Sequence, residues 1–181
     1  FIKKFKGATR YKDLKVGHFK TIHDKKTNTQ FFGLVFYFGE NVIITLRGTD
    51  RTFEGWREDF NMALLDTIPS QKIATKFVSN IVKNHIKSPI FLVGHSKAGN
   101  LVYYAYLNLI KEEQDLIKKV YNLDGPGFRN DNYDYKSHNK KLIKIVPNED
   151  VVGVIFDLSF NFDIVLTHRT GVFAHDLLCR E

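Results

Sequence analysis

The sequence predicts an α/β fold in which helices flank a mostly parallel sheet and an antiparallel meander forms the N-terminal part. The meander is predicted by two aromatic and β-branched runs, residues 30–38 and 42–46, which the turn-forming Gly39-Glu40-Asn41 separates. The parallel part is predicted because strand-like and helical patterns alternate along the rest of the chain. The length of 181 residues suits one domain, so we treat residues 1–181 as a single domain.

The first half of the chain holds the antiparallel strands and two helices. A short strand over residues 19–23 precedes the hairpin, and Arg47-Gly48-Thr49-Asp50 follows the hairpin directly. Loops at the carboxyl ends of core strands are where α/β sheets hold their ligands. A short helix is predicted over residues 52–65, and an amphipathic helix begins at Pro69-Ser70 and ends before Ser88-Pro89.

The second half alternates between strands and helices. A buried strand over residues 90–93 leads into a tight turn and an apolar helical pattern over residues 101–110. The charged stretch 112–119 is predicted to end that helix or to form a second short one. Residues 131–141 are polar and rich in Asn and Tyr, which is typical of a surface loop. Further strands are predicted over residues 120–123, 142–146 and 160–167.

The turn at Gly94-His95-Ser96 is the main candidate for chemistry. A strand, a sharp turn and a helix with one serine at the apex are the context of a nucleophile elbow. Strand and helix nearly touch at such a turn, so small residues are needed two positions before and after the serine. Gly94 and Ala98 meet that need, and an ordinary strand-to-helix turn is the alternative interpretation.

Composition and charge exclude several classes of protein. The hydrophobic fraction of 43% is typical of a folded chain, and the single cysteine, Cys179, excludes an internal disulfide framework. No apolar run reaches the ~20 residues that cross a bilayer. The net charge of +7 is compatible with peripheral contact with an anionic membrane, although the lysines are scattered as on a solvated surface. We expect no nucleic-acid partner because no such motif is present.

The sequence carries no visible signal peptide, so we expect a cytoplasmic protein. The chain begins at Phe1 rather than methionine, which is also compatible with a piece of a longer protein. The oligomeric state stays open.

A serine nucleophile needs a histidine base and an orienting carboxylate, which follow it in the order Ser, acid, His in this type of fold. Asp124 and Asp150 both follow predicted strands after Ser96. Chain order and strand position favour Asp150 as the acid. Asp124 is alternatively a turn-former in Asp-Gly-Pro-Gly, and Asp150 a loop carboxylate that caps a turn.

Two histidines satisfy the order of a base that follows the acid. They are His168 and His175, whereas His138 precedes Asp150 and lies in the polar stretch. His95 adjoins the serine, but on an elbow its side chain points away, so we assign it a packing or supporting role.

The reaction also needs donors for the oxyanion. One is the backbone N–H of the residue after the serine, Lys97, and the other is expected from Gly48-Thr49 beside it. Trp56 and Asp59 lie three apart on a predicted helical turn, and we expect them to support the Thr49 loop. The alternative is a plain glycine turn, a core tryptophan and a solvated aspartate.

These motifs together resemble the fungal-type class 3 lipases of the α/β-hydrolase fold, and more closely a bacterial lipase-like branch. The resemblance implies carboxylic ester hydrolysis on a lipid or other acyl ester, with Asp150 as the acid and His175 as the base. It implies no cofactor and no metal. The motifs that carry it are Arg47 to Asp50, Gly55 to Asn61, Gly94 to Asn100, Asp124 to Phe128, Pro147 to Gly153 and Gly171 to Asp176.

The chain departs from that branch at two positions. Ala98 stands where the branch has glycine, and the tryptophan expected shortly after His175 is absent. These departures keep a second hypothesis in view, in which the fold is a binding module for acyl or lipid ligands with weak or no catalysis.

Overall fold

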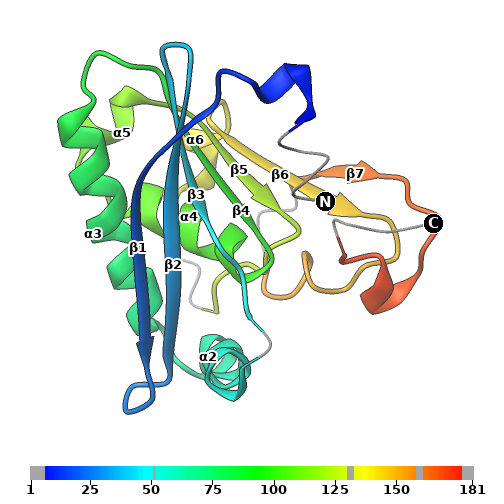
Figure 1. Ribbon diagram of the computed structural model, residues 1–181. Coiled ribbons are helices and arrows are strands. Elements are labelled where there is room, and N and C mark those ends of the chain that lie inside the picture. The colour runs from blue at the N-terminus through cyan, green and yellow to red at the C-terminus, as the bar shows by residue number, and fades with distance from the viewer. Residues whose placement is uncertain (1–6, 51, 130–132, 158–160, 177–181) are drawn as a thin grey trace.

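The computed structural model describes residues 7–50, 52–129, 133–157 and 161–176, which form a twisted seven-stranded sheet with strands in sequence order (Figure 1). The first three strands pair antiparallel, and each later strand joins its neighbour in parallel. The predicted fold class is therefore confirmed. The strands are β1 (Lys15–Asp24), β2 (Thr29–Phe38), β3 (Asn41–Leu46), β4 (Ile90–His95), β5 (Ile117–Leu123), β6 (Leu142–Pro147) and β7 (Asp163–Val165).

Several strand boundaries differ from those that the sequence predicts. β1 begins at Lys15, because a register shift between Val16 and Phe19 lets the strand continue across an irregularity. β5 begins at Ile117, inside the charged stretch predicted as helical, because pairing with β4 and β6 overrides local composition. β7 has three residues, all exposed, at the edge of the sheet.

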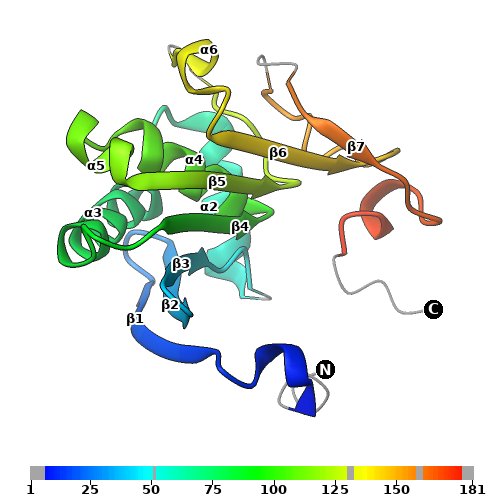
Figure 2. The same cartoon turned by 90° about the horizontal axis from the view of Figure 1, so that it is seen from above.

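Helices cover one face of the sheet (Figures 1 and 2). The elements are η1 (Thr9–Tyr11), α2 (Phe53–Leu64), α3 (Pro69–Asn84), α4 (Lys97–Leu107), α5 (Lys111–Leu116), α6 (Tyr135–His138) and η2 (Gly171–Phe173). α4 packs on β4 and β5 and contacts α3, which in turn packs on β2. Pro69 starts α3 because its fixed φ suits a first helical residue.

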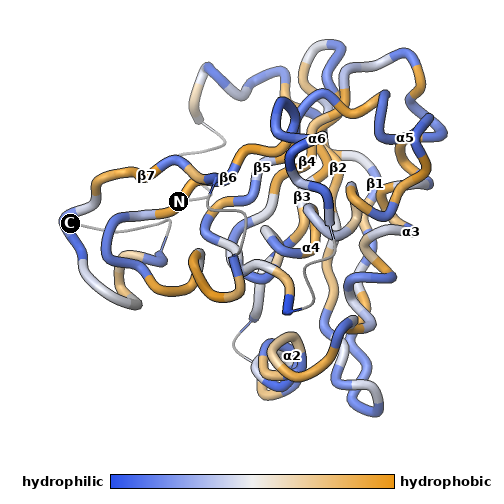
Figure 3. The backbone as a smooth tube through the Cα atoms, turned by 180° about the vertical axis from the view of Figure 1, so that it is seen from behind, coloured by the Kyte–Doolittle hydropathy of each residue, from blue (hydrophilic) through white to orange (hydrophobic). Residues whose placement is uncertain are grey.

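The core lies between this face of the sheet and the helices α3 and α4. β3 and β4 alternate buried and half-buried residues, with Val42, Ile44, Ile90 and Leu92 facing the helices. Figure 3 shows the matching hydrophobic colouring along the central strands. No helix in the described part of the chain is long and apolar enough to span a membrane.

Residues 133–141 of the predicted polar loop contain a helix and packed aromatic rings. The helix is α6, and the rings of Tyr133 and Tyr135 pack around Phe128, with Tyr133 also against Tyr104 of α4. These aromatic contacts hold the connection between β5 and β6 against the helical layer.

Candidate active site

Ser96 occupies a strained turn between β4 and α4. Its φ of 58° and ψ of −133° are unusual for a residue with a side chain, and this strain is what a nucleophile elbow requires. A Cβ placed on Gly94 would lie 2.1 Å from the carbonyl oxygen of Ala98, so strand and helix touch as the sequence predicts. Ser96 itself is half-buried and therefore accessible.

His175 follows η2 and brings its ring to the carboxyl edge of the sheet, where two carboxyl groups meet it. Its Nδ1 lies 2.6 Å from Oδ2 of Asp124 and 3.1 Å from Oδ2 of Asp150. Because both oxygens accept, Nδ1 carries the proton and Nε2 keeps a lone pair, which is the tautomer that a general base needs.

The turn after β5 therefore contributes a group that the sequence suggested only as an alternative. Asp124 is 1% exposed with a φ of 55°, and its oxygen is nearer to His175 than that of Asp150. The sequence favours Asp150, whereas the structure brings both acids to the same nitrogen. The sequence does not favour a role for Asp124 in the site, because an aspartate in Asp-Gly-Pro-Gly is explained by turn formation alone.

The other histidines lie in different environments. His95 donates from Nε2 to the backbone oxygen of His175 at 2.9 Å, and the two rings lie 4.6 Å apart, which fits the supporting role predicted for His95. His168 is exposed, and His138 contacts the hydroxyl of Tyr106 at 3.1 Å. Only His175 among these meets carboxyl groups in the described structure.

The charges of this cluster shift the pKa values of its members in opposite directions. Burial raises the pKa of Asp124 to about 6, and contact with Asp150 adds to the rise despite the hydrogen bond to His175. For Asp150, burial is outweighed by the hydrogen bond from Asp124 and by the backbone N–H groups of Val151 and Val152, so its pKa is lowered. Burial would lower the pKa of His175, but the two aspartates outweigh it and raise it.

The loop after β3 lies against the elbow. A Cβ placed on Gly48 would lie 2.8 Å from the carbonyl oxygen of His95, so only glycine lets the loop approach this closely. The hydroxyl of Thr49 donates to the carboxylate of Asp59, with oxygen distances of 2.8 and 2.7 Å. The hydroxyl is thus engaged, and the group that Thr49 could offer an oxyanion is its backbone N–H. Burial raises the pKa of Asp59 in spite of this bond.

Of the two residues expected to support this loop, Asp59 does so directly. Trp56 is 58% exposed and contributes instead to the wall of a pocket. The difference arises because α2 turns its polar side toward the protein and its aromatic side outward. Glu58 of α2 is fully buried, at 0% exposure.

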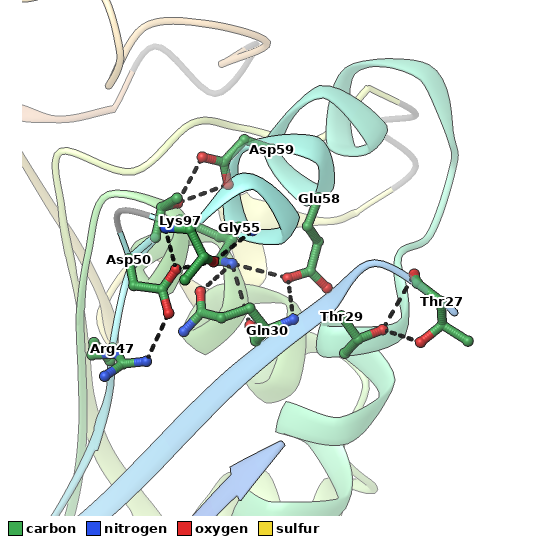
Figure 4. A network of polar contacts seen from close by, with 11 residues as sticks. Thr27, Thr29, Gln30, Arg47, Asp50, Gly55, Glu58, Asp59 and Lys97 are labelled. Atoms are coloured by element: carbon green, nitrogen blue, oxygen red, sulfur yellow. Dashed lines mark hydrogen bonds and ion pairs between the residues drawn. The ribbon is translucent and has the colours of Figure 1, made fainter. Parts of the chain in front are cut away.

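Lys97 takes part in the site through its backbone and in the fold through its side chain. As the first residue of α4, its N–H lies in the helix turn whose amides have no intrahelical acceptor, which suits an oxyanion donor. Its ammonium is buried and reaches Oε2 of Glu58 and Oε1 of Gln30, both at 2.9 Å (Figure 4). The side chain therefore ties α4 to α2 and β2 beneath the nucleophile.

An apolar pocket of about 350 Å³ opens at Ser96. Its size falls in the range of small-molecule sites, roughly 300–1,000 Å³. Its lining comes from α2, the elbow, the 126–127 turn and the 152–156 segment. The lining residues are Trp56, Asp59, Phe60, Met62, Ala63, Ser96, Lys97, Pro126, Gly127, Val152, Ile155 and Phe156.

Within the described residues, no hydrogen bond joins the Ser96 hydroxyl to His175. The contacts of His175 with the two acids are thus formed, whereas a contact with Ser96 is not. Such contacts are often long in unliganded enzymes and shorten in the substrate complex.

The same cluster contains a set of atoms that could hold a metal ion. One ligand atom each from His95, Asp124 and His175 lie within 4.8 Å of one another. A cation bound through Nδ1 of His175 would displace the proton that this nitrogen gives to Asp124. The donor set therefore fits the protonated imidazole better than a metal, and the absence of a metal requirement remains a prediction.

Comparisons with known proteins give a family, from a family model, and a fold, from solved structures. A family model described as Mbeg1-like matches residues 5–180. A comparison with curated proteins finds no match. The lipase II of Rhizopus niveus is a similar solved structure, with 15% identity, a TM-score of 0.60, and 82% of this chain and 63% of that chain covered.

Two further solved structures are similar, with somewhat lower TM-scores. A triacylglycerol lipase from Penicillium expansum has 18% identity and a TM-score of 0.55 over 87% of this chain and 71% of that chain. The Lip2 lipase of Yarrowia lipolytica has 13% identity and a TM-score of 0.54 over 87% and 66%. The fold is thus a lipase-like α/β-hydrolase fold, as the resemblance implies, and the chain spans less than two thirds of the Rhizopus niveus lipase.

Proposed function

Because the chain belongs to the Mbeg1-like family, we propose that it is a serine hydrolase that cleaves a carboxylic ester of an apolar acyl group. The observation that carries the proposal is a strained, accessible Ser96 that lines an apolar pocket. We assign the role of its base to His175, whose Nδ1 is held by Asp124 and Asp150. The lipase-like fold supports it.

The proposed reaction begins when His175 Nε2 takes the proton of the Ser96 hydroxyl and Oγ attacks the ester carbonyl. The imidazolium then protonates the leaving alkoxide, and an acyl-enzyme on Ser96 remains. Water attacks this ester with the same base, which releases the acid and restores the serine. Asp150 and Asp124 keep Nδ1 protonated throughout.

The oxyanion of each tetrahedral intermediate is assigned to the backbone N–H groups of Lys97 and Thr49. The N-terminus of α4 adds the positive end of its dipole. Asp59 holds the Thr49 loop, and Gly48 lets it reach the elbow. The walls of the pocket, to which Phe60 and Phe156 contribute, provide the surface for the acyl chain.

A fluorophosphonate probe is expected to label Ser96 of the intact chain, and short-chain p-nitrophenyl esters are expected to give a burst of nitrophenol. Both readouts require an activated serine, whereas a binding module for acyl ligands gives neither. Peptide mapping of the labelled chain identifies the modified residue. Ligand binding without label or burst would overturn the hydrolase proposal in favour of the binding module for acyl ligands.

We also propose that the rim of this pocket contacts a lipid surface. α2 exposes Phe53, Trp56, Phe60 and Leu64, with exposed fractions of 69, 58, 68 and 65%. Their spacing along the helix places them on one stripe, and Trp56 and Phe60 of this stripe also line the pocket. Monomeric proteins rarely leave such contiguous apolar surface free of a function.

When vesicles of phosphatidylcholine and phosphatidylglycerol are sedimented, the wild-type chain is expected to pellet with them. The Phe53→Ser/Phe60→Ser variant is expected to stay in the supernatant. Removing two of the four stripe residues lowers the buried apolar area directly. Ile110→Ser is the matched control, since Ile110 is 60% exposed and lies away from α2. Binding to anionic vesicles should weaken with added salt. Equal sedimentation of all three proteins would remove α2 as the contact.

A further inference from the structure

Asp124 is buried at a position where turn formation alone does not explain a carboxyl group. Its side chain is 1% exposed, and its backbone N–H donates to the carbonyl oxygen of Ile145 at 2.8 Å, which fixes the turn after β5. A buried carboxyl group without a partner is costly. The turn itself would be served by glycine or asparagine, because φ is 55°. The carboxyl group is therefore explained by what it contacts.

Two carboxyl groups converge on a single N–H. Nδ1 of His175 lies 2.6 Å from Asp124 Oδ2 and 3.1 Å from Asp150 Oδ2, so both carboxyl groups meet at one nitrogen. Beyond the effect of burial, their mutual interaction raises the pKa of Asp124 and lowers that of Asp150. Carboxylates this close do not both ionise easily, so one retains a proton at low pH. The pKa values divide accordingly, with Asp124 raised to about 6 and Asp150 lowered.

The two acids are stabilised differently. Oδ1 of Asp150 accepts the backbone N–H groups of Val151 at 2.6 Å and Val152 at 3.0 Å, which favours the ionised form. Oδ1 of Asp124 is buried and has no hydrogen-bond partner among the described residues. An unpartnered oxygen favours the neutral carboxyl group. The contacts thus assign the shared proton to Asp124.

We propose that Asp124 is a second acid of the site, a positioning residue that shares a proton with Asp150 and holds His175 jointly with it. The inference rests on the proposed serine hydrolase function. In it, the cluster carries one negative charge when Asp124 is protonated and two after it ionises. The second charge strengthens the hold on the imidazolium that forms when His175 accepts the Ser96 proton.

The titratable groups that face Asp124 come from several elements, and groups this close are expected to influence each other's titration. His175 and Asp150 contact it directly, and His95 of β4 offers a ring nitrogen within the same cluster. Lys144 of β6 forms a buried ion pair with Asp157. Burial lowers the pKa of Lys144, and the charge of Asp124 acts in the opposite direction. Removal of the Asp124 charge is therefore expected to lower the pKa of His175, because an attractive partner is lost and burial remains.

The test compares Asp124→Asn, Asp150→Asn and the double variant by kcat/KM against pH and by NMR titration of the His175 ring. Each single variant is expected to lose about 10–100-fold in kcat and the double variant about 10⁴-fold. One remaining carboxylate can still hold the Nδ1–H group of His175, whereas the double variant has none. The rate requires neutral His175, so the acid limb should move to lower pH in Asp124→Asn. Asp115→Asn, on the exposed side of α5, is the control for charge removal and should change neither.

Gly153→Ala provides a second route to the same group. A Cβ at Gly153 would lie 2.3 Å from Oδ1 of Asp124, so the substitution displaces Asp124 without changing any titratable residue. It is expected to lower the His175 pKa in the same direction. If Asp124→Asn and Gly153→Ala both keep the wild-type His175 titration and pH profile, Asp124 is a turn residue and the proposal fails.

The two proposals fail separately. The NMR titration of His175 does not depend on turnover. A chain that neither reacts with fluorophosphonate nor hydrolyses esters, yet shows the His175 shift in Asp124→Asn, overturns the hydrolase function and retains the shared acid. A labelled, active chain in which only Asp150→Asn alters the His175 titration overturns the shared acid and retains the function. An unfolded Asp124→Asn leaves the decision to the Gly153→Ala titration.

Discussion

Replacing Ser96 with alanine is expected to lower ester turnover by about 10⁴–10⁶-fold, the usual loss when the nucleophile of a triad is removed. The hydroxyl of Ser96 is the group placed at the mouth of the apolar pocket beside the amide of Lys97. The measurement is the steady-state rate with a p-nitrophenyl ester, together with fluorophosphonate labelling of the same sample. Labelling that survives in Ser96→Ala would refute the assignment.

The backbone of Ser96 supplies a control that separates activity from folding. Its φ of 58° is a conformation that glycine adopts readily and other residues adopt at a cost of about 1–3 kcal/mol. Ser96→Gly is therefore expected to abolish turnover and to raise the free energy of unfolding by about 1 kcal/mol, whereas Ser96→Ala leaves it nearly unchanged. Urea unfolding measures both. A loss of stability in Ser96→Gly would show that the elbow is not strained.

The sequence predicts well those parts of the fold that depend on local pattern. The hairpin around Gly39, the helix that starts at Pro69 and the turn at Ser96 all follow from turn chemistry and apolar spacing, and the structure has them. The extension of β1 to Lys15 and the early start of β5 were missed. Both depend on pairing with a neighbouring strand rather than on their own residues.

The motifs of the candidate site can be predicted from the sequence, but which of their side chains meet in the folded chain cannot. Gly94 and Ala98 give the elbow through their size, and Thr49 meets Asp59 because both belong to adjacent motifs. Nothing local relates Asp124 to His175, which is 51 residues away in sequence, so its carboxyl group was hidden behind a good turn signal.

The side chain of Lys97 was invisible for the same reason. A lysine after an active serine looks like a solvated residue, and only the folded chain puts Glu58 and Gln30 around it. All three ammonium protons have acceptors there, since the backbone oxygen of Gln30 lies 3.3 Å away. The backbone N–H of Gln30 in turn donates to Oε2 of Glu58 at 3.0 Å.

Removing one partner of this buried pair is expected to cause a large loss of stability. Lys97 and Glu58 are 1 and 0% exposed in their side chains, with Nζ and Oε2 2.9 Å apart. Lys97→Met leaves the Glu58 carboxylate buried without a counter-charge, which costs about 3–5 kcal/mol in such pairs. That is a large part of the roughly 5–15 kcal/mol that stabilise a typical domain. Urea denaturation of Lys97→Met against the wild-type chain measures the loss.

Two further variants decide whether buried charge is the cause. The double variant Lys97→Met/Glu58→Leu should recover most of the stability, because apolar replacements of a buried pair are often neutral or better. The pair Lys111–Asp115, 2.8 Å apart with side chains 72 and 58% exposed, is the matched control. Lys111→Met is expected to change the free energy of unfolding by no more than about 1 kcal/mol. If Lys97→Met lowers the free energy of unfolding by no more than this control does, Lys97 does not hold α2 and β2 beneath the nucleophile. The support that α2 gives to the oxyanion loop would then not depend on the buried pair.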